Sequence, residues 1–436
     1  MINRRDFVKT GAAAGLLLGL APSFGCSSKV EASAKVLIVG GGAAGISVAA
    51  RLRRRLPNGK ITIADPAEKH FYQPGFTFIG AGIWQADDVW LKEADVMPSG
   101  VTWVKEAVVA VLPDKNVAVT KSGARLDYDF LVLAPGLQEN WSLVEGVTRE
   151  TLGAGNAHSI YDWQGSVNTW KAVQAFVKKG GKGVFTDTWT KHKCGGAPKK
   201  ICLLAEELAR KAGTRGKTSF NYFTASKELY DVPHYTPRLE RIYAERNVPI
   251  RLNAKLTGVD VQAKRAHFED RATGEKFTEE YDFLHFAPPQ SAPDFVRTSG
   301  LGWTEGKLAR EAWAMVDKKT LVHKTFGNVL ALGDVAGIPT SKTSAAIRKQ
   351  APVVVENLLS LVAGKEPARE YDGYAACPII TDNGHVIMAE FDYEKKPVPS
   401  FPFNLMDTSK ELRCAWWLKA YVLKPMYFRL MLKGLA

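Results

Sequence analysis

Apolar runs that alternate with glycine turns and helical patterns organise the first part of the chain. Residues 35–39 form a β-rich apolar run, and residues 40–45 are mostly glycine. An apolar-periodic stretch then continues to about Leu56, and a second apolar run at 61–64 ends in Asp65. The order strand, tight turn, helix and strand is typical of a parallel sheet that is covered by helices. The pattern therefore predicts an α/β fold.

Further apolar runs indicate that the chain builds two such units. A helical pattern covers 166–178, and a short strand is expected at 183–186. Two buried-strand patterns, at 128–136 and 328–334, each end in a turn that contains glycine. We expect two Rossmann-like dinucleotide-binding domains that are interleaved in the sequence. Residues 35–150 with 320–370 form the first domain, 151–319 form the second, and 371–436 form a C-terminal region.

The turn at 40–45 has the spacing G-x-G-x-x-G that binds a dinucleotide. Gly40 permits the tight turn, Gly42 lets the backbone approach a pyrophosphate, and Gly45 lets helix and strand pack closely. The unpaired N–H groups at the start of the helix then face the phosphates. Asp65 stands twenty residues after Gly45, where a carboxylate accepts a hydrogen bond from a ribose hydroxyl. Motif, context and acidic residue together predict a dinucleotide site.

The later runs at 128–136 and 328–334 indicate which dinucleotide to expect. They resemble the other two fingerprints of the two-dinucleotide-domain flavoproteins, in which the Gly-Asp carboxylate contacts the flavin chain. No second G-x-G-x-x-G follows the strand expected at 183–186, which argues against an NADH dehydrogenase. FAD is therefore the predicted cofactor. The predicted FAD contacts are Gly40, Gly42, Ala43, Ala44, Gly45, Asp65, Pro66, Gln73, Val108, Ala134, Gly136, Gly333, Asp334, Lys342 and Thr343.

Composition narrows the class of protein without choosing a function. The chain has 436 residues, of which 46% are hydrophobic and 24% charged, and these values exclude disordered, collagenous and polytopic membrane proteins. Five cysteines are too few for a disulfide-stapled scaffold, so each is judged for its reactivity. The 58 basic and 45 acidic residues give a net charge of +13. Such a surplus suits nucleic acid, an anionic membrane or an anionic substrate.

The first 34 residues have the pattern of a targeting signal. Arg4 and Arg5 precede an apolar stretch from 11 to 21 that is too short to span a bilayer. Twin arginines favour the route that exports folded proteins, so we expect a protein on the periplasmic side of the cytoplasmic membrane. Two endings stay open. The chain is cleaved after Ala34, or a lipid on Cys26 leaves the residues that follow as a tether.

Cys194 lies in a context that favours a reactive thiolate. Pro198 marks the first turn of an expected helix, so Cys194 lies at a helix N-terminus. The partial positive charge there favours the thiolate and lowers its pKa, and nearby lysines add to the effect: Lys193, Lys199 and Lys200. The following pair of glycines lets a ligand approach the backbone. Cys202 is expected in the core, and Cys414 is expected to have no role.

Residues 412–436 interleave aromatic and basic side chains. The segment holds five cations, and no acid follows Glu411. No uncharged run reaches 18 residues, so the segment is not expected to span a bilayer. The pattern predicts an interfacial helix or helix pair, broken at Pro425, that binds a membrane surface, and a C-terminal helix packed on the core is the alternative. The predicted apolar face holds Trp416, Trp417, Tyr421, Leu423, Tyr427, Phe428, Leu430 and Met431.

Several segments between residue 35 and the C-terminus resemble the sulfide:quinone oxidoreductase family, in particular the subgroup that includes the mitochondrial enzymes. The segments around two cysteines, 193–200 and 371–378, are the specific ones. Other matching stretches are 51–55, 70–74, 339–343 and 389–393. Alone, Cys377 carries little signal, so its importance comes from the resemblance.

The resemblance implies a redox centre in which Cys194 and Cys377 face FAD. Sulfide attacks this centre and leaves a persulfide on Cys377, and the released thiolate of Cys194 passes two electrons to the flavin. The sulfane sulfur leaves with a further sulfide or a small thiol, and membrane quinone takes the electrons. Two interpretations of Lys200 stay open: it holds the Cys194 thiolate, or, as the favoured alternative, it is a solvated lysine on the helix face. The expected quinone-pocket residues are Phe391, Tyr393, Phe401 and Phe403.

Two other functions stay open at this point. The flavoprotein subunit of flavocytochrome c sulfide dehydrogenase also has a twin-arginine signal and a cysteine pair. It usually attaches its flavin to a cysteine, and residues 70–80 contain none. A non-catalytic flavoprotein scaffold would leave the cysteine contexts without a purpose. Neither a metal site nor a nucleic-acid partner is predicted, and a homo-oligomer is left open.

Overall fold

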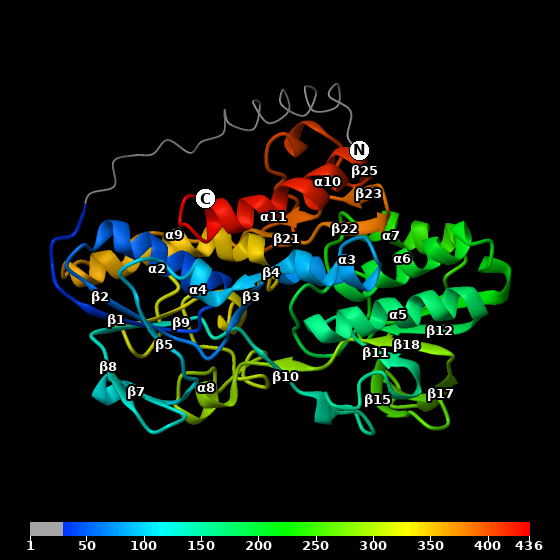
Figure 1. Ribbon diagram of the computed structural model, residues 1–436, viewed down its shortest axis with the longest axis horizontal. Coiled ribbons are helices and arrows are strands. Elements are labelled where there is room, and N and C mark those ends of the chain that lie inside the picture. The colour runs from blue at the N-terminus through cyan, green and yellow to red at the C-terminus, as the bar shows by residue number, and fades with distance from the viewer. Residues whose placement is uncertain (1–28) are drawn as a thin grey trace.

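The protein contains two five-stranded parallel sheets. The computed structural model describes residues 29–436. Figure 1 shows the two sheets in two lobes that lie side by side. The first sheet has the order β20-β9-β1-β2-β5. Its strands are β1 (Lys35–Val39), β2 (Lys60–Ala64), β5 (Thr102–Val104), β9 (Phe130–Leu133) and β20 (Val329–Ala331). The late strand β20 pairs in parallel with β9, so the chain returns to its first sheet after building the second.

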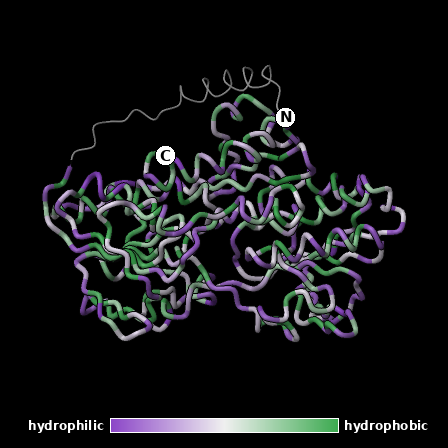
Figure 2. Tube along the Cα trace, in the orientation of Figure 1, coloured by the Kyte–Doolittle hydropathy of each residue, from purple (hydrophilic) through white to green (hydrophobic). Residues whose placement is uncertain are grey.

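The central strands of the first sheet are buried because helices cover them. Every residue of β20 is buried, and β1 exposes only its first residue. Helices α2 (Ala43–Arg55) and α9 (Ser344–Val362) contact each other beside this sheet. Parallel strands covered by helices read as continuous apolar runs, which is the pattern found at 35–39 and 128–136. Figure 2 shows these strands as a hydrophobic centre in the same lobe.

The second sheet has the order β11-β18-β12-β13-β14. Its strands are β11 (Ala157–His158), β12 (Gly181–Thr186), β13 (Thr218–Phe223), β14 (Ile250–Arg251) and β18 (Phe283–Phe286). Its helices are α5 (Trp163–Lys179), α6 (Ala197–Lys211) and α7 (Thr236–Glu245). The Asp162 side chain caps α5 by accepting a hydrogen bond from the Gly165 N–H. Pro198 stands in the first turn of α6, where a missing N–H costs nothing.

Smaller elements complete and connect the lobes. Antiparallel sheets extend each lobe: β6 (Val108–Leu112), β7 (Val117–Thr120) and β8 (Arg125–Asp127) in the first, and β15 (Ala254–Asp260), β16 (Arg265–Asp270) and β17 (Lys276–Glu280) in the second. The pair β10 (Gln138–Glu139) and β19 (Gln290–Ser291) lies between the lobes. The remaining elements are β3 (Lys69–Phe71), β4 (Trp90–Lys92), α3 (Phe76–Gly80), α4 (Glu93–Val96) and α8 (Asp294–Thr298). The predicted boundaries at 150, 320 and 370 stay predictions.

The C-terminal region lies across the top of both lobes in Figure 1. It contains β21 (Ala375–Ala376), β22 (Ile379–Asp382), β23 (His385–Ile387), β24 (Glu390–Phe391), β25 (Glu411–Leu412), α10 (Arg413–Trp417) and α11 (Leu423–Met426). The predicted break at Pro425 is wrong, because Pro425 lies inside α11. Wider π-helical turns at 418–422 and 427–431 flank it, so the helical path continues past the missing N–H donor.

One face of this C-terminal helix packs on the core. Trp416, Tyr427 and Met431 are buried, whereas Trp417 and Tyr421 are exposed. The alternative of a helix packed on the core therefore holds for one face. Between residues 29 and 436, no helix has both the length and the apolar character needed to cross a bilayer. The features of the predicted signal at Arg4, Arg5 and Cys26 lie outside the described residues.

Candidate active site

Two cysteines that are distant in the sequence meet where α6 faces the C-terminal region. Cys194 lies in the turn before α6, and Cys377 follows β21. Their Sγ atoms are 3.8 Å apart. Cys377 is buried, and its N–H donates a hydrogen bond to the Ala389 carbonyl. The structure thus brings together the two thiols that the resemblance pairs, while their roles stay predictions.

Lys200 lies beside this sulfur pair and not in solvent as predicted. Its Nζ is 3.0 Å from Sγ of Cys194 and 3.8 Å from Sγ of Cys377. The Lys200 side chain is buried because the first turns of α6 lie between the second sheet and β22. Sequence alone did not show this, since a helical lysine is usually solvated unless tertiary contacts cover its face.

The pKa values of the two thiols are shifted in opposite directions. A hydrogen bond from the Cys377 thiol outweighs burial and, with the Lys200 ammonium, holds the pKa of Cys194 well below its usual value. The hydrogen bond to Cys194 and burial raise the pKa of Cys377 well above its usual value. Although burial favours a neutral amine, the neighbouring thiolate raises the pKa of Lys200. The cluster is therefore a thiolate on Cys194, a thiol on Cys377 and an ammonium on Lys200.

Backbone contacts hold Cys194 in a conformation that non-glycine residues rarely adopt. Its φ is +50°, in the left-handed region. Its N–H donates to the Lys342 carbonyl at 3.1 Å, and its carbonyl accepts from the Ala197 N–H at 2.8 Å. A Cβ on Gly196 would lie 2.8 Å from Sγ of Cys377. The glycine that sequence analysis linked to a close ligand instead makes room for the second sulfur.

The glycine loop before α2 has the backbone geometry that a dinucleotide requires. A Cβ on Gly40 would lie 2.3 Å from the Ala134 carbonyl oxygen, and a Cβ on Gly45 would lie 1.9 Å from that of Gly40. A Cβ on Gly42 would meet no atom of residues 29–436 within 4 Å. The Asp65 carboxylate accepts hydrogen bonds from the N–H groups of Gly41 and Ala67 at 2.5 and 2.7 Å. The loop is thus closely packed at its ends and open at Gly42.

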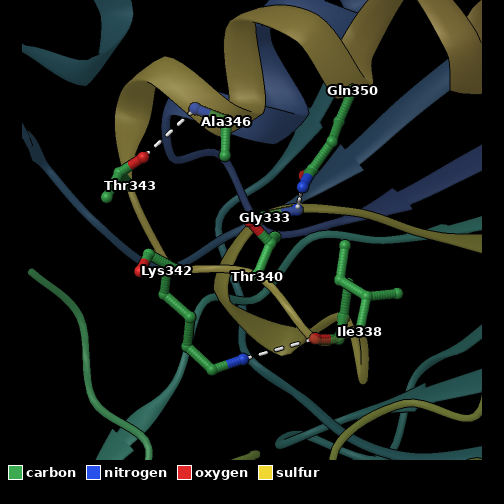
Figure 3. A pocket seen from close by; sticks show the side chains of 9 residues that line it. Gly333, Ile338, Thr340, Lys342, Thr343, Ala346 and Gln350 are labelled. Atoms are coloured by element: carbon green, nitrogen blue, oxygen red, sulfur yellow. Dashed lines mark hydrogen bonds between the residues drawn. The ribbon is translucent and has the colours of Figure 1, made fainter. Parts of the chain in front are cut away.

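Three of the later predicted cofactor residues, Gly333, Lys342 and Thr343, line one pocket (Figure 3). The Gln350 side chain accepts a hydrogen bond from the Gly333 N–H at 2.8 Å. Thr343 caps α9 by accepting from the Ala346 N–H at 3.2 Å. Sequence reasoning missed Gln350, which lies inside a helix without a motif.

Lys342 is held between the two lobes by contacts that no local motif indicates. Its Nζ donates to the carbonyls of Asp334 and Ala336 and lies 3.5 Å from the centre of the Trp313 ring. Burial and the nearby charge of Lys191 lower the pKa of Lys342 to about 7. Because the Lys342 carbonyl also binds the Cys194 N–H, the predicted cofactor loop and the sulfur centre share one residue.

The other predicted cofactor residues lie in several parts of the first lobe. Gly136 has a φ of +76°, and a Cβ there would meet no atom within 4 Å in the described part of the chain. Ala134 is the residue against which Gly40 packs. Ala43 and Ala44 open α2, Pro66 follows Asp65, Gln73 begins a short 3₁₀ turn, and Val108 is buried at the start of β6. Their contact with a cofactor stays a prediction.

The four residues expected in a quinone pocket do not share one environment. Phe391 and Phe403 are buried in the core around α6, whereas Phe401 is nearly half exposed. Tyr393 is partly exposed and donates a hydrogen bond to the Lys318 carbonyl at 2.5 Å. The four side chains therefore differ in burial, and their contact with a quinone stays a prediction. The burial differs because strand β24 turns Phe391 into the core, while the following loop leaves Phe401 outside.

Comparisons with known proteins point to one family. The model of a family described as pyridine nucleotide-disulphide oxidoreductase matches residues 34–177. The mitochondrial sulfide:quinone oxidoreductase of Dictyostelium discoideum is 38% identical over 407 residues, covering 93% of this chain and 87% of that protein. The corresponding protein of Mus musculus is 37% identical over 402 residues, covering 92% of this chain and 86% of that protein.

A solved structure is similar in fold. The sulfide:quinone oxidoreductase from Aquifex aeolicus matches with a TM-score of 0.74 at 21% identity, covering 88% of each chain. This likeness and the family model confirm the predicted α/β fold of the pyridine nucleotide-disulphide oxidoreductase type.

The comparisons also correct the predicted location. Relatives from Dictyostelium discoideum, Mus musculus and Schizosaccharomyces pombe are named as mitochondrial proteins. This finding contradicts export by the twin-arginine route to the periplasm, with or without a lipid on Cys26. The prediction failed because a basic, apolar N-terminus is common to several kinds of targeting segment.

Identity above one third extends over more than nine tenths of the chain, and the fold matches as well. The chain therefore belongs to the sulfide:quinone oxidoreductase family.

Proposed function

We propose that this protein oxidises sulfide to sulfane sulfur at Cys194 and Cys377 and passes two electrons to a membrane quinone. The observation that carries the proposal is the geometry of the cluster, in which the two sulfurs are 3.8 Å apart and Lys200 Nζ is 3.0 Å from Sγ of Cys194. Relatives whose names state the same two substrates support it. The cluster suits sulfur exchange because thiolate character makes a cysteine reactive.

FAD is the cofactor that we assign to the glycine loop and the Gly333 pocket. Open space at Gly42 and Gly136 supports this, since a phosphate or flavin chain can approach the backbone there. Asp65 would bind the ribose, while Asp334, Lys342 and Thr343 would face the flavin end. Bound FAD would supply a two-electron acceptor between the sulfur pair and the quinone.

The chain's own residues explain the first sulfur step. In the oxidised state the two cysteines form a disulfide. HS⁻ attacks Sγ of Cys377, the disulfide bond breaks, Cys194 leaves as a thiolate, and a persulfide remains on Cys377 while the sulfide proton is released. Lys200 stabilises the departing thiolate, and a low thiol pKa makes Cys194 the faster leaving group.

A small thiolate or a second HS⁻ then removes the sulfane sulfur. It attacks the outer persulfide sulfur, which leaves with it, and Cys377 remains as a thiolate or thiol. The two reduced cysteines now hold the two electrons taken from sulfide. These electrons would pass to bound FAD when the disulfide forms again. A polar cavity of about 290 Å³, lined in part by Gln290, Arg297 and Arg310, supports this step because it offers the acceptor a route toward the cysteines. Gln290 accepts a hydrogen bond from the N–H of Lys193, next to Cys194.

We also propose that the C-terminal region binds a membrane surface from which quinone enters. Exposed apolar side chains gather on two of its segments: Phe401, Leu405, Met406, Trp417 and Tyr421. The sulfur atoms of Met406 and Cys414 are 3.7 Å apart, so the two segments lie side by side. Exposed apolar patches with neighbouring cations favour binding at the bilayer interface.

Anaerobic titration of the purified protein with sulfide tests the function. Bleaching of the flavin that is reversed by a soluble quinone supports the proposal. Reversal only by cytochrome c would favour the flavocytochrome subunit, and absence of bleaching would favour a non-catalytic scaffold. The relatives found do not favour either alternative.

Substitution of each cysteine tests the assignment of the centre. Cys194→Ser and Cys377→Ser should each abolish bleaching by sulfide, because each removes one sulfur of the disulfide. The flavin content should stay unchanged. Cys414→Ser, at an exposed position, is the matched control and should bleach like the parent protein.

A further inference from the structure

A buried ion pair lies beside the turn that carries Cys194. Asp187 follows β12, and Lys199 lies in the first turn of α6. Both side chains are at least nine-tenths buried, and Lys199 Nζ is 3.1 Å from Oδ2 of Asp187. We propose that Asp187 and Lys199 are positioning residues that hold Cys194 at the distance from Cys377 needed for bridging. This inference rests on the proposed function, because it explains how the same centre is assembled.

Asp187 is anchored to the second sheet independently of Lys199. Its Oδ2 accepts a hydrogen bond from Oγ1 of Thr224 at 2.7 Å, and its Oδ1 accepts one from the N–H of Ala225 at 2.9 Å. Both partners follow β13, the strand that pairs with β12. These two hydrogen bonds therefore fix the Asp187 carboxylate relative to the sheet without any contribution from Lys199.

Lys199 connects this anchor to the cysteine turn. Besides Asp187, its Nζ donates to the carbonyl of Gly195 at 3.2 Å and to the hydroxyl of Tyr222 at 3.2 Å. Gly195 follows Cys194 directly, and a further glycine follows it. Glycine peptides change conformation easily, so a side chain that holds the Gly195 carbonyl restricts the turn.

The turn needs such restraint because Cys194 adopts a left-handed backbone. A non-glycine residue in this region is strained and keeps this conformation only where its surroundings impose it. Without the Lys199 contact, the turn could relax toward a negative φ and carry Sγ of Cys194 away from Cys377. The separation of 3.8 Å between the sulfurs would then no longer be maintained.

The energetics of buried ion pairs agree with a positioning role. Burial of two charges carries a large desolvation penalty, and apolar replacements of such pairs are often neutral or stabilising. Stability of the core therefore does not account for a lysine and an aspartate at this place. Their contacts join three parts of the chain, β12, the residues after β13 and the Cys194 turn.

The equilibrium between the dithiol and the disulfide of Cys194 and Cys377 tests the inference. We would equilibrate the holoprotein anaerobically in glutathione redox buffers, quench it with an alkylating agent and measure the bridged fraction by mass spectrometry. Lys199→Met should lower the equilibrium constant for bridging by about tenfold or more, since small misplacements of reacting atoms have effects of this size. Lys199→Arg, which keeps a charged donor, should recover most of the loss.

A double variant and a control keep the test decisive. Asp187→Asn/Lys199→Met leaves no unpaired buried charge and should show the same loss as Lys199→Met. Lys211→Met, at the exposed end of the same helix, should leave bridging unchanged. Bridging within about threefold of the parent in both Lys199→Met and the double variant would overturn the inference. Failure of both to fold would also overturn it, since the pair would then support the core.

The result is separable from the proposed function because bridging needs no sulfide. A parent protein that bridges normally but does not bleach with sulfide would contradict the function alone. Unchanged bridging in the variants of a protein that does bleach would contradict the positioning role alone.

Discussion

At the scale of single residues, the chemistry depends on an asymmetry between two thiols. Lys200 lies closer to Cys194 than to Cys377, so the negative charge resides on Cys194. Cys377 keeps the proton and donates it in a hydrogen bond. A stabilised thiolate is the better leaving group, so sulfide attack on Cys377 is favoured over attack on Cys194.

The role of Lys200 is open to a direct test by titration. Lys200→Met should raise the pKa of Cys194, because the thiolate loses the ammonium that stabilises it. The pH midpoint for alkylation of Cys194 by iodoacetamide in the reduced protein should rise. In the parent, alkylation should continue well below the usual thiol midpoint and stop as the pH falls through the lowered pKa.

Two variants complete this titration. Lys200→Arg keeps the charge and should leave the midpoint near that of the parent, whereas Lys211→Met removes a lysine from the same helix without effect. A midpoint that does not move in Lys200→Met would show that the Cys377 hydrogen bond alone sets the thiolate.

At the scale of elements, the strand–turn–helix unit at the start of the chain separates two uses of glycine. Gly40 and Gly45 allow backbone segments to approach each other, and the space at Gly42 is free for a ligand. Stability and cofactor binding should therefore respond to different glycines of one motif.

The two alanine substitutions should give opposite results. Gly45→Ala should lower the free energy of unfolding by about 1–3 kcal/mol or more, since its Cβ would lie 1.9 Å from the Gly40 carbonyl oxygen. Gly42→Ala should cost less than about 1 kcal/mol, because its φ of −69° suits alanine. It should weaken FAD binding by about tenfold or more, which is measured by reconstitution of the flavin-free protein. Equal FAD affinity in Gly42→Ala and the parent would contradict the assignment of the loop.

The C-terminal helical segment is a second element with two faces. Its buried face holds Trp416 and Tyr427, and its exposed face holds Trp417 and Tyr421. Trp417→Ser/Tyr421→Ser should reduce binding to vesicles of neutral and anionic phospholipids by about tenfold or more, because two large apolar side chains no longer enter the bilayer interface. Co-sedimentation with vesicles measures this loss.

The matched control is Leu143→Ser, which removes an equally exposed apolar side chain from the loop after β10. It should leave vesicle binding unchanged. An equal loss in both variants would show that the C-terminal face has no particular affinity for the membrane.

At the scale of the whole molecule, the C-terminal segment is fastened to the lobe that carries the glycine loop. Arg54, in the last turn of α2, donates to the Gly434 carbonyl at 2.8 Å, and Arg51 donates to the carbonyl of Ala436. Nε2 of His70 is 2.7 Å from the Tyr427 hydroxyl, and Nδ1 of His70 is 3.1 Å from the Glu93 carboxylate. The basic residues of α2, Arg51 and Arg54, therefore bind the C-terminal segment. As a result, the proposed membrane face has a fixed position relative to the glycine loop before α2.

Loss of one such contact should loosen the segment. Tyr427→Phe should lower the free energy of unfolding by about 1–2 kcal/mol, because it leaves the buried His70 without a partner at Nε2. Urea denaturation measures the change, and limited proteolysis should cut the C-terminal segment earlier than in the parent. Tyr421→Phe changes an exposed hydroxyl and should have no effect on either measurement. Equal stability of the two variants would contradict the fastening role of Tyr427.

Local patterns were sufficient for some features of this protein and insufficient for others. The spacing of Gly40, Gly42 and Gly45 after an apolar run was sufficient to predict the strand, the turn and the helix, because these depend on backbone contacts between near neighbours. Pro198 likewise marked the start of α6. The expectations of a solvated Lys200 and of a break at Pro425 were wrong, because each depends on which remote segment covers a given face.

The α/β class, the glycine loop and the position of Cys194 at a helix end could be predicted from the sequence, since they follow from short-range sterics and from the charge at a helix terminus. Three features required the folded chain: Cys377 approaches Cys194 to 3.8 Å, Lys200 is buried beside both sulfurs, and Trp416 and Tyr427 pack inward. Burial and proximity arise when segments far apart in the chain pack together, and no local spacing records which segments will meet.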